Sequence, residues 1–172
     1  MFACEQGLNN LSNELITREA DTYAKNNEGV DILQTACKVG NKKVLSELGE
    51  YTLKSLDRKL GKDKQTMLII ASEYCNKEVV DYLLDNGANY SIKDKNGKTA
   101  IMYAYDWENY GIITSLLNKG ADPNEHYLES NNLTKIQKWL KSYNKEKNKT
   151  VSKIKTIASE LVEKPKENNL SL

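Results

Sequence analysis

Apolar residues recur in the middle of the chain at the spacing of one face of an α-helix. Two such sets are Val79, Val80, Leu83 and Leu84, and Ile112, Ile113, Leu116 and Leu117. Residues three and four positions apart share a helix face, so each set predicts an amphipathic helix with a buried stripe. Gly87 and Gly120 follow the two sets and supply the left-handed backbone that ends a helix.

The apolar pattern belongs to a longer repeat. The segment Ala3-Cys4-Glu5-Gln6-Gly7 returns 33 residues later as Ala36-Cys37-Lys38-Val39-Gly40. Asn86-Gly87-Ala88 returns after the same interval as Lys119-Gly120-Ala121. The step from Ala36 to Ala71 is 35 residues, which predicts two extra residues between Gly40 and Thr66. A period of this length is typical of solenoids, in which stacked copies supply the core that one helix pair lacks.

Residues 94–124 resemble an ankyrin repeat. Asp94 and Gly97 match the turn of that family, Thr99 matches its helix-opening threonine, and Leu116-Leu117 with Gly120-Ala121-Asp122 match its second helix and exit. Residues 63–90 are a second match, and two N-terminal copies are degenerate. The resemblance implies an all-α ankyrin-repeat solenoid of stacked helix-turn-helix units with short β-turn fingers. About four repeats are expected, at residues 1–29, 30–62, 63–95 and 96–128.

Individual residues of the repeat carry further expectations. Thr66 and Thr99 are expected to cap their helices by accepting a backbone hydrogen bond. The family's histidine, which links adjacent repeats, is replaced by Gln34, Ile69 and Met102, so we expect a less rigid array than a consensus one. Cys4 and Cys37 occupy a small-residue position that predicts buried packing, whereas Cys75 stands where the family has glycine at the end of a first helix.

Helical periodicity continues after the repeats. Leu133, Ile136 and Leu140 form one apolar stripe, and a second contains Val151, Ile154, Ala158 and Leu161. Residues 144–149 are polar and are interpreted as a loop between two helices. We therefore expect an atypical helical cap at residues 129–164 and a flexible tail at residues 165–172.

The family resemblance implies a partner surface on the concave side, built from the turns and the first helices. Aligning the repeats gives one column with Gln6, Val39, Tyr74 and Trp107, and a neighbouring column with Glu5, Lys38, Glu73 and Asp106. Adjacent helices pack about 10 Å apart, so Tyr74 and Trp107 are expected side by side as binding anchors. The alternative is that they pad the groove between helices, and Tyr103 is either part of the surface or half-buried.

Charged residues complete the candidate surface. Glu73 and Asp106 would give it an acidic edge that favours a partner with basic residues, although two solvated charges are an equal alternative. The turn tips add a set of polar candidates: Lys62, Asp63, Gln65, Lys95, Asn96 and Lys98.

Composition narrows the classes of function. The chain has 172 residues, a formal net charge of +1 and three cysteines, an odd number that favours a reducing compartment. No apolar run approaches the roughly 18 residues of a membrane helix, and no secretory signal is visible. We expect a soluble cytoplasmic protein without a membrane partner, or one in the host cytoplasm if it is a secreted effector.

Other chemical signals are weak. Lysines crowd one segment in which Glu146 is the single acid: Lys135, Lys138, Lys141, Lys145, Lys147, Lys149, Lys153 and Lys155. This segment is interpreted as the solvated face of the cap, with nucleic-acid binding as the alternative. His126 is the single histidine, so no metal site is expected, and no cofactor or catalytic constellation is indicated.

The leading hypothesis is a non-enzymatic binder of one protein partner, monomeric when unbound, that acts as an inhibitor or adaptor. A microbial or viral effector in a host cell is one possible setting, and a toxin-neutralising immunity protein is another.

Overall fold

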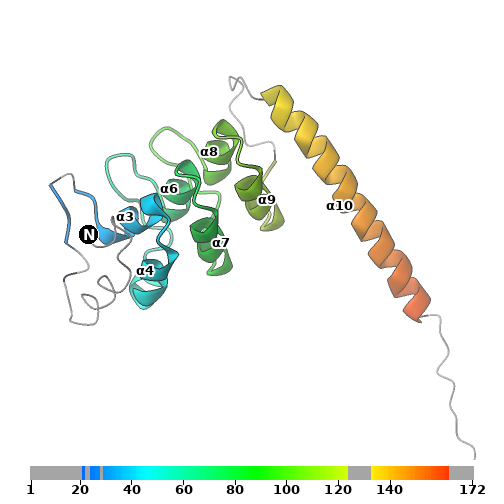
Figure 1. Ribbon diagram of the computed structural model, residues 1–172, viewed down its shortest axis with the longest axis horizontal. Helices are drawn as coiled ribbons and strands as arrows, with labels where there is room; N and C mark the ends of the chain where they lie inside the picture. Colours follow the sequence, from blue (N-terminus) through cyan, green and yellow to red (C-terminus); the bar gives the residue numbers. More distant parts are fainter. Residues whose placement is uncertain (1–20, 22–23, 28, 124–132, 163–172) are drawn as a thin grey trace, which may run out of the picture. The chain divides into compact units, whose positions relative to one another are not determined.

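The computed structural model describes Asp21, residues 24–27 and 29–123, and the helix at residues 133–162, whose side chains are described from Gln137 to Lys155 (Figure 1). The expected first repeat lies largely outside these residues. The helices are α3 (Ile32–Val39), α4 (Lys42–Glu47), α5 (Glu50–Lys54), α6 (Met67–Glu73), α7 (Lys77–Asp85), α8 (Ala100–Asp106), α9 (Tyr110–Asn118) and α10 (Leu133–Val162). The chain divides into two units, residues 1–132 and residues 133–172.

Three helix pairs stack within the described residues of the first unit. In each pair a first helix (α3, α6 or α8) packs against a second helix (α4, α7 or α9), and each helix also packs against its counterpart in the next pair. Figure 1 shows the first helices in one row and the second helices in another. This two-layer stack confirms the predicted all-α solenoid.

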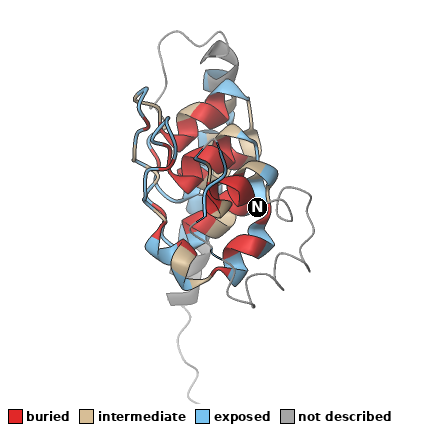
Figure 2. Cartoon of the chain, turned by 90° about the vertical axis from the view of Figure 1, so that its left-hand side faces the viewer, coloured by how far each residue is buried: buried red, intermediate tan, exposed pale blue. Residues whose placement is uncertain are grey.

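The core lies between the two layers, where Figure 2 shows the buried residues gathered. Ala36, Ala71 and Ala104 are fully buried at the centres of the first helices, where a methyl side chain lets neighbouring helices approach closely. The predicted apolar stripes of α7 and α9 are buried as well. Truncating one buried leucine in such a core costs about 2–5 kcal/mol, so stacking supplies most of the stability of these short helices.

Helix capping follows the sequence prediction at one threonine and departs from it at the other. Thr66 Oγ1 accepts a 3.3 Å hydrogen bond from the backbone N–H of Ile69, as predicted. The prediction for Thr99 is wrong, because its hydroxyl is buried and makes no hydrogen bond within the described chain. In the first of the three described helix pairs, Asp31 occupies the same position at the start of α3 and forms a capping box with Gln34.

An asparagine links the repeats where the family's histidine is absent. The Asn76 side-chain amide donates hydrogen bonds to the carbonyl oxygens of Cys37, at 2.7 Å, and Lys38, at 2.9 Å. Asn41 and Asn109 stand at the same position of their own repeats, directly before α4 and α9. These hydrogen bonds join the start of α7 to the end of α3, the first helix of the previous repeat.

The second helix of the first described pair is interrupted. α4 ends at Glu47, Gly49 takes a positive φ of 42°, and the chain continues as α5. Thr52 is fully buried and donates a 2.8 Å hydrogen bond from its hydroxyl to the carbonyl oxygen of Leu45, which joins the two parts. The two extra residues of the sequence alignment fall in this stretch, between Gly40 and Thr66.

The predicted loop at residues 144–149 is wrong. α10 continues through it as one helix of 30 residues. The segment contains neither glycine nor proline, and its lysines and glutamate are good helix formers, so polar character alone does not end the helix. The two predicted apolar stripes therefore belong to a single helix.

Candidate protein-binding surface

A row of exposed apolar residues crosses the first helices. Val39 is 45% exposed, Tyr74 is 48% exposed and Trp107 is 61% exposed. They are the last residue of α3 and the C-caps of α6 and α8, and so occupy equivalent positions of three neighbouring helices. Within the described chain, three of the six exposed large hydrophobic residues fall in this row. The row contains three of the four members of the predicted column, and the fourth, Gln6, lies outside the described residues.

The backbone after each of these residues explains why the row is exposed. The next residue is in the left-handed conformation in all three repeats: Gly40 (φ 75°), Cys75 (φ 59°) and Glu108 (φ 49°). This residue turns the chain from the first helix into the second, so the preceding side chain remains on the outer rim of the helix. Cys75 does stand at the glycine position and is exposed, and Cys37 is buried as predicted.

The two acids of the neighbouring column have partners within the molecule. Glu73 Oε2 accepts a 2.7 Å hydrogen bond from the Gln65 side-chain amide. Asp106 forms a 2.7 Å ion pair with Lys98. The third member of the column is Lys38, whose ammonium lies 5.7 Å from the centroid of the Tyr74 ring. Both acids of the predicted edge are therefore engaged by groups of the same molecule.

Tyr103 is a buried structural residue, 9% exposed. Its hydroxyl donates a 2.8 Å hydrogen bond to Asp94 Oδ2 and accepts one of 3.3 Å from the Gln65 side-chain amide. Burial, together with the adjacent Asp94 carboxylate, raises the pKa of Tyr103. Lys98 covers its ring at 5.2 Å from the centroid. The sequence left Tyr103 open between the surface and the interior, and the structure places it inside.

The two fingers, residues 59–65 and 93–98, are joined to each other. Lys95 forms an ion pair with Asp63 and donates a 3.0 Å backbone hydrogen bond to the carbonyl oxygen of Asp63. Asp94 Oδ1 accepts hydrogen bonds from the backbone N–H groups of Asn96, at 2.8 Å, and Lys98, at 2.9 Å. Among the predicted turn residues, Gln65 is buried, and Asp63 and Lys95 bind each other.

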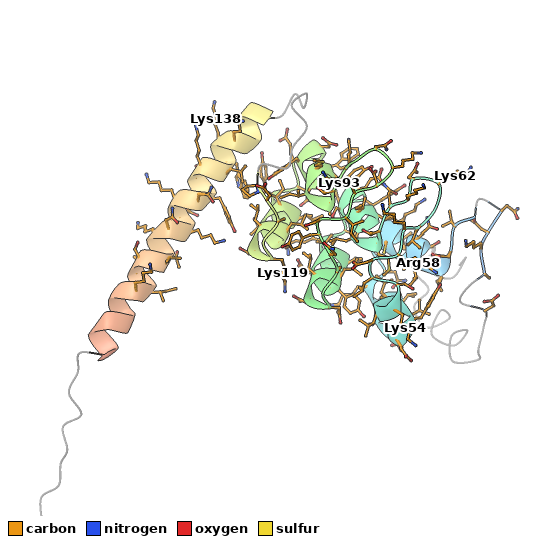
Figure 3. The ribbon with its side chains drawn as sticks, turned by 180° about the vertical axis from the view of Figure 1, so that it is seen from behind. Lys54, Arg58, Lys62, Lys93, Lys119 and Lys138 are labelled. Atoms are coloured by element: carbon orange, nitrogen blue, oxygen red, sulfur yellow. The ribbon has the colours of Figure 1, made fainter. Side chains whose placement is uncertain are left out.

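Lysines give the two fingers positive charge that is not balanced by ion pairs within the described chain. Four of them are exposed and make no ion pair within the described chain: Lys59, Lys62, Lys64 and Lys93. Figure 3 labels Lys62 on the first finger and Lys93 on the second. Only Lys62 was a candidate from sequence. The others were missed because a lysine in a polar turn carries no information until the ion pairs of its neighbours are known.

A groove of about 280 Å³ lies between α3 and the first finger. Its lining combines apolar and polar groups: Val30, Gln34, Lys38, Leu60, Gly61, Lys62, Asp63 and Gln65. The volume suits one or two side chains of a partner. The sequence had placed Lys62, Asp63 and Gln65 at turn tips, and the structure brings them against Gln34 and Lys38 of the first helix.

Comparison with known proteins identifies the family. A family model that describes ankyrin repeats in three copies matches the chain over residues 1–94 and 54–127. The chain is an ankyrin repeat protein. The stacked helix pairs described above are consistent with the solenoid of that family.

Two viral proteins are similar to this ankyrin repeat protein. An ankyrin repeat protein of fowlpox virus (strain NVSL) is 28% identical over 116 residues, which are 66% of this chain and 26% of that protein. An ankyrin repeat protein of Acanthamoeba polyphaga mimivirus is 38% identical over 56 residues, 33% of this chain and 35% of that protein. The matched region spans about a quarter and about a third of these relatives.

Two further findings concern metals and membranes. Within the described part of this ankyrin repeat protein, no three histidine, cysteine, aspartate or glutamate side chains are grouped so that they could hold a metal ion. No described helix is both long and apolar enough to span a membrane.

Proposed function

We propose that this ankyrin repeat protein binds one partner protein through α3, α6, α8 and the two fingers, and that it acts by covering a functional site of that partner. The observation that carries the proposal is the exposed row of Val39, Tyr74 and Trp107. Large apolar side chains that are exposed together on the surface of a monomeric protein commonly mark a site of interaction with another molecule.

Tyr74 and Trp107 are the proposed anchors. Tyrosine and tryptophan are enriched among the few residues that dominate binding energy, with losses of about 2 kcal/mol or more on truncation. Such anchors work best when polar neighbours exclude water around them. Lys38, Glu73 and Asp106 border the row and would form this rim.

The charges favour an acidic partner over the basic one expected from sequence. Asp106 is paired with the positive charge of Lys98, whereas Glu73 keeps its charge and accepts a hydrogen bond from the Gln65 amide. Lys59, Lys62, Lys64 and Lys93 remain available on the fingers, and complementary charge on a partner would speed its encounter with the surface. The groove beside Lys38 and Lys62 would accept a carboxylate-bearing side chain.

The proposed setting is a viral or microbial effector that acts as an inhibitor or adaptor in a host cell. Both reported relatives are viral proteins, which supports this setting over that of a toxin-neutralising immunity protein. An effector is expected to capture a protein of the host, whereas an immunity protein would capture a toxin from its own genome.

Affinity capture from host-cell extract, followed by mass spectrometry, tests the proposal. The expected result is a specific partner that binds the wild-type protein and binds the Tyr74→Ala/Trp107→Ala variant at least about tenfold more weakly. Leu53→Ala is the matched control, because Leu53 is also 45% exposed but lies on α5, outside the row. Equal binding by the double variant would contradict the proposed surface, and recovery of no specific protein would contradict the proposed function.

A further inference from the structure

The strongest charge asymmetry of the chain lies on α10. Its described side chains include seven lysines and a single acid, Glu146, and all eight are exposed. The whole chain has a formal net charge of only +1, so this helix is far more basic than the protein that carries it. Within the described residues of α10, these lysines form no ion pair.

Four of the lysines occupy the face opposite the apolar residues of this helix. Lys138, Lys141, Lys145 and Lys149 follow one another at spacings of three, four and four residues, which place them in one stripe. Trp139 and Tyr143 lie on the other side, with their rings stacked at a centroid distance of 5.2 Å. Val151, 43% exposed, and Ile154, 60% exposed, continue that side toward the C-terminus.

The continuity of α10 aligns this apolar face along its length. Val151 follows Leu133 by 18 residues, which is five turns at about 3.6 residues per turn, so the two apolar stripes of the sequence lie along one line. Two separate helices, as the sequence pattern suggested, would not have this common face. The continuous helix has the features of a surface-lying amphipathic helix: a lysine-rich face opposite an apolar face with aromatic rings.

We propose that α10 binds the surface of an anionic lipid bilayer, lying in the interface with the exposed part of its apolar face, at Val151 and Ile154, toward the acyl chains. This binding surface is independent of the row on the first helices. It replaces the expectation of no membrane partner, which rested on the net charge of the whole chain and on the absence of a spanning segment.

Lys147 favours a bilayer over the groove of an acidic protein. It lies within the apolar face, between Tyr143 and Val151, and its ammonium lies 5.9 Å from the centroid of the Tyr143 ring. A closed apolar groove would bury this charge at a high cost. At a membrane interface a lysine side chain of this length reaches back to the headgroups while its methylene groups remain among apolar neighbours.

The exposed apolar residues of α10 argue against nucleic acid as the natural ligand. Lysines alone would bind phosphates, but Val151 and Ile154 would then remain in water on the far side of the helix. A bilayer uses both faces, because acyl chains cover the apolar residues while anionic headgroups attract the lysines.

Co-sedimentation of the full chain with phosphatidylcholine vesicles, with and without phosphatidylserine, tests this proposal. Binding is expected only when phosphatidylserine is present, and it should weaken as salt is added. In a Trp107→Phe background, Trp139 is the remaining tryptophan, and its emission should shift to shorter wavelength on binding. No sedimentation with phosphatidylserine vesicles would overturn the proposal.

Two variants separate the contributions of the two faces. Changing the stripe Lys138, Lys141, Lys145 and Lys149 to glutamate should reduce vesicle binding by well over about a hundredfold, because each lysine contributes roughly fivefold. Changing Lys59, Lys62, Lys64 and Lys93 to glutamate alters the net charge equally and should leave much more of the binding intact. Val151→Ser/Ile154→Ser should reduce binding about tenfold or more without altering charge.

Two results would assign α10 to another ligand. If Val151→Ser/Ile154→Ser binds vesicles as well as wild type, the apolar face is not inserted and the proposal fails. If duplex DNA or RNA displaces the protein from vesicles and binds it more tightly at the same salt concentration, the helix is a nucleic-acid site and the proposal also fails. Circular dichroism of each variant should show unchanged helix content, since every substituted side chain is exposed.

Discussion

The hydroxyl of Tyr103 donates a 2.8 Å hydrogen bond to the carboxylate of Asp94. The bond joins the first helix of one repeat to the turn that precedes it, because Asp94 also accepts hydrogen bonds from the backbone of Asn96 and Lys98. Gln65, from the preceding finger, donates to the same tyrosine hydroxyl. Tyr103 thus helps to hold the fingers that border the proposed binding surface.

Replacing Tyr103 with phenylalanine removes this connection without removing the ring. The free energy of unfolding should fall by about 1–3 kcal/mol, because the buried Asp94 carboxylate and the Gln65 amide each lose a partner. Urea unfolding followed by circular dichroism measures the change. Tyr74→Phe is the control, since its hydroxyl makes no hydrogen bond in the described chain and its loss should alter stability by less than about 0.5 kcal/mol. An equal effect of both variants would show that the Asp94 bond contributes nothing.

The raised pKa of Tyr103 predicts a distinct alkaline response. The folded protein keeps this phenol protonated above pH 10, the approximate pKa of a tyrosine in an unfolded chain. The stabilisation is therefore complete below that pH and is lost as the pH rises above it, by up to about 1.4 kcal/mol per pH unit. Urea unfolding at a series of alkaline pH values should show a steeper fall for the wild type than for Tyr103→Phe. Parallel curves would contradict the assigned pKa direction.

The repeat architecture could be predicted from sequence because it depends on period and pattern. The apolar stripes of α7 and α9 and the alanines of the first helices recur at fixed positions, and burial follows from that recurrence. The exposed positions of Tyr74 and Trp107 follow from the same alignment, because a residue's place in the repeat fixes its side of the helix.

Features that depend on particular side-chain partners could not be predicted. Glu73 and Asp106 appeared to be free acids, and only the positions of Gln65 and Lys98 reveal that they are engaged. The uninterrupted course of α10 was missed for a different reason. A polar segment suggests a loop, but lysine and glutamate are compatible with an exposed helix, and the absence of glycine and proline was the better signal.

The hydrogen bonds of Asn76 predict that the loss of this side chain loosens the contact between α3 and α7. Asn76→Ala leaves the carbonyl oxygens of Cys37 and Lys38 without this donor and should lower the free energy of unfolding by about 1–3 kcal/mol. Hydrogen exchange should increase in α3 more than in α9, because the lost bonds join α7 to the end of α3. Asn86→Ala is the control, since Asn86 is exposed and bonds within its own helix end, to the carbonyl oxygen of Tyr82. Uniformly faster exchange in α3 and α9 would argue against a local link.

Cys75 provides a test of the backbone conformation that exposes the row. A side chain at its φ of 59° costs about 1–2 kcal/mol, which glycine avoids, although glycine also gains entropy in the unfolded chain. Cys75→Gly is therefore expected to raise the free energy of unfolding by up to about 1 kcal/mol. Glu78→Gly, at an exposed position of α7, should lower it by about 1 kcal/mol. Urea unfolding of both variants gives the comparison, and destabilisation by both would mean that Cys75 is not held in the left-handed region in solution. A stabilised Cys75→Gly protein should bind the captured partner as tightly as wild type, because the substitution leaves Tyr74 at the same turn.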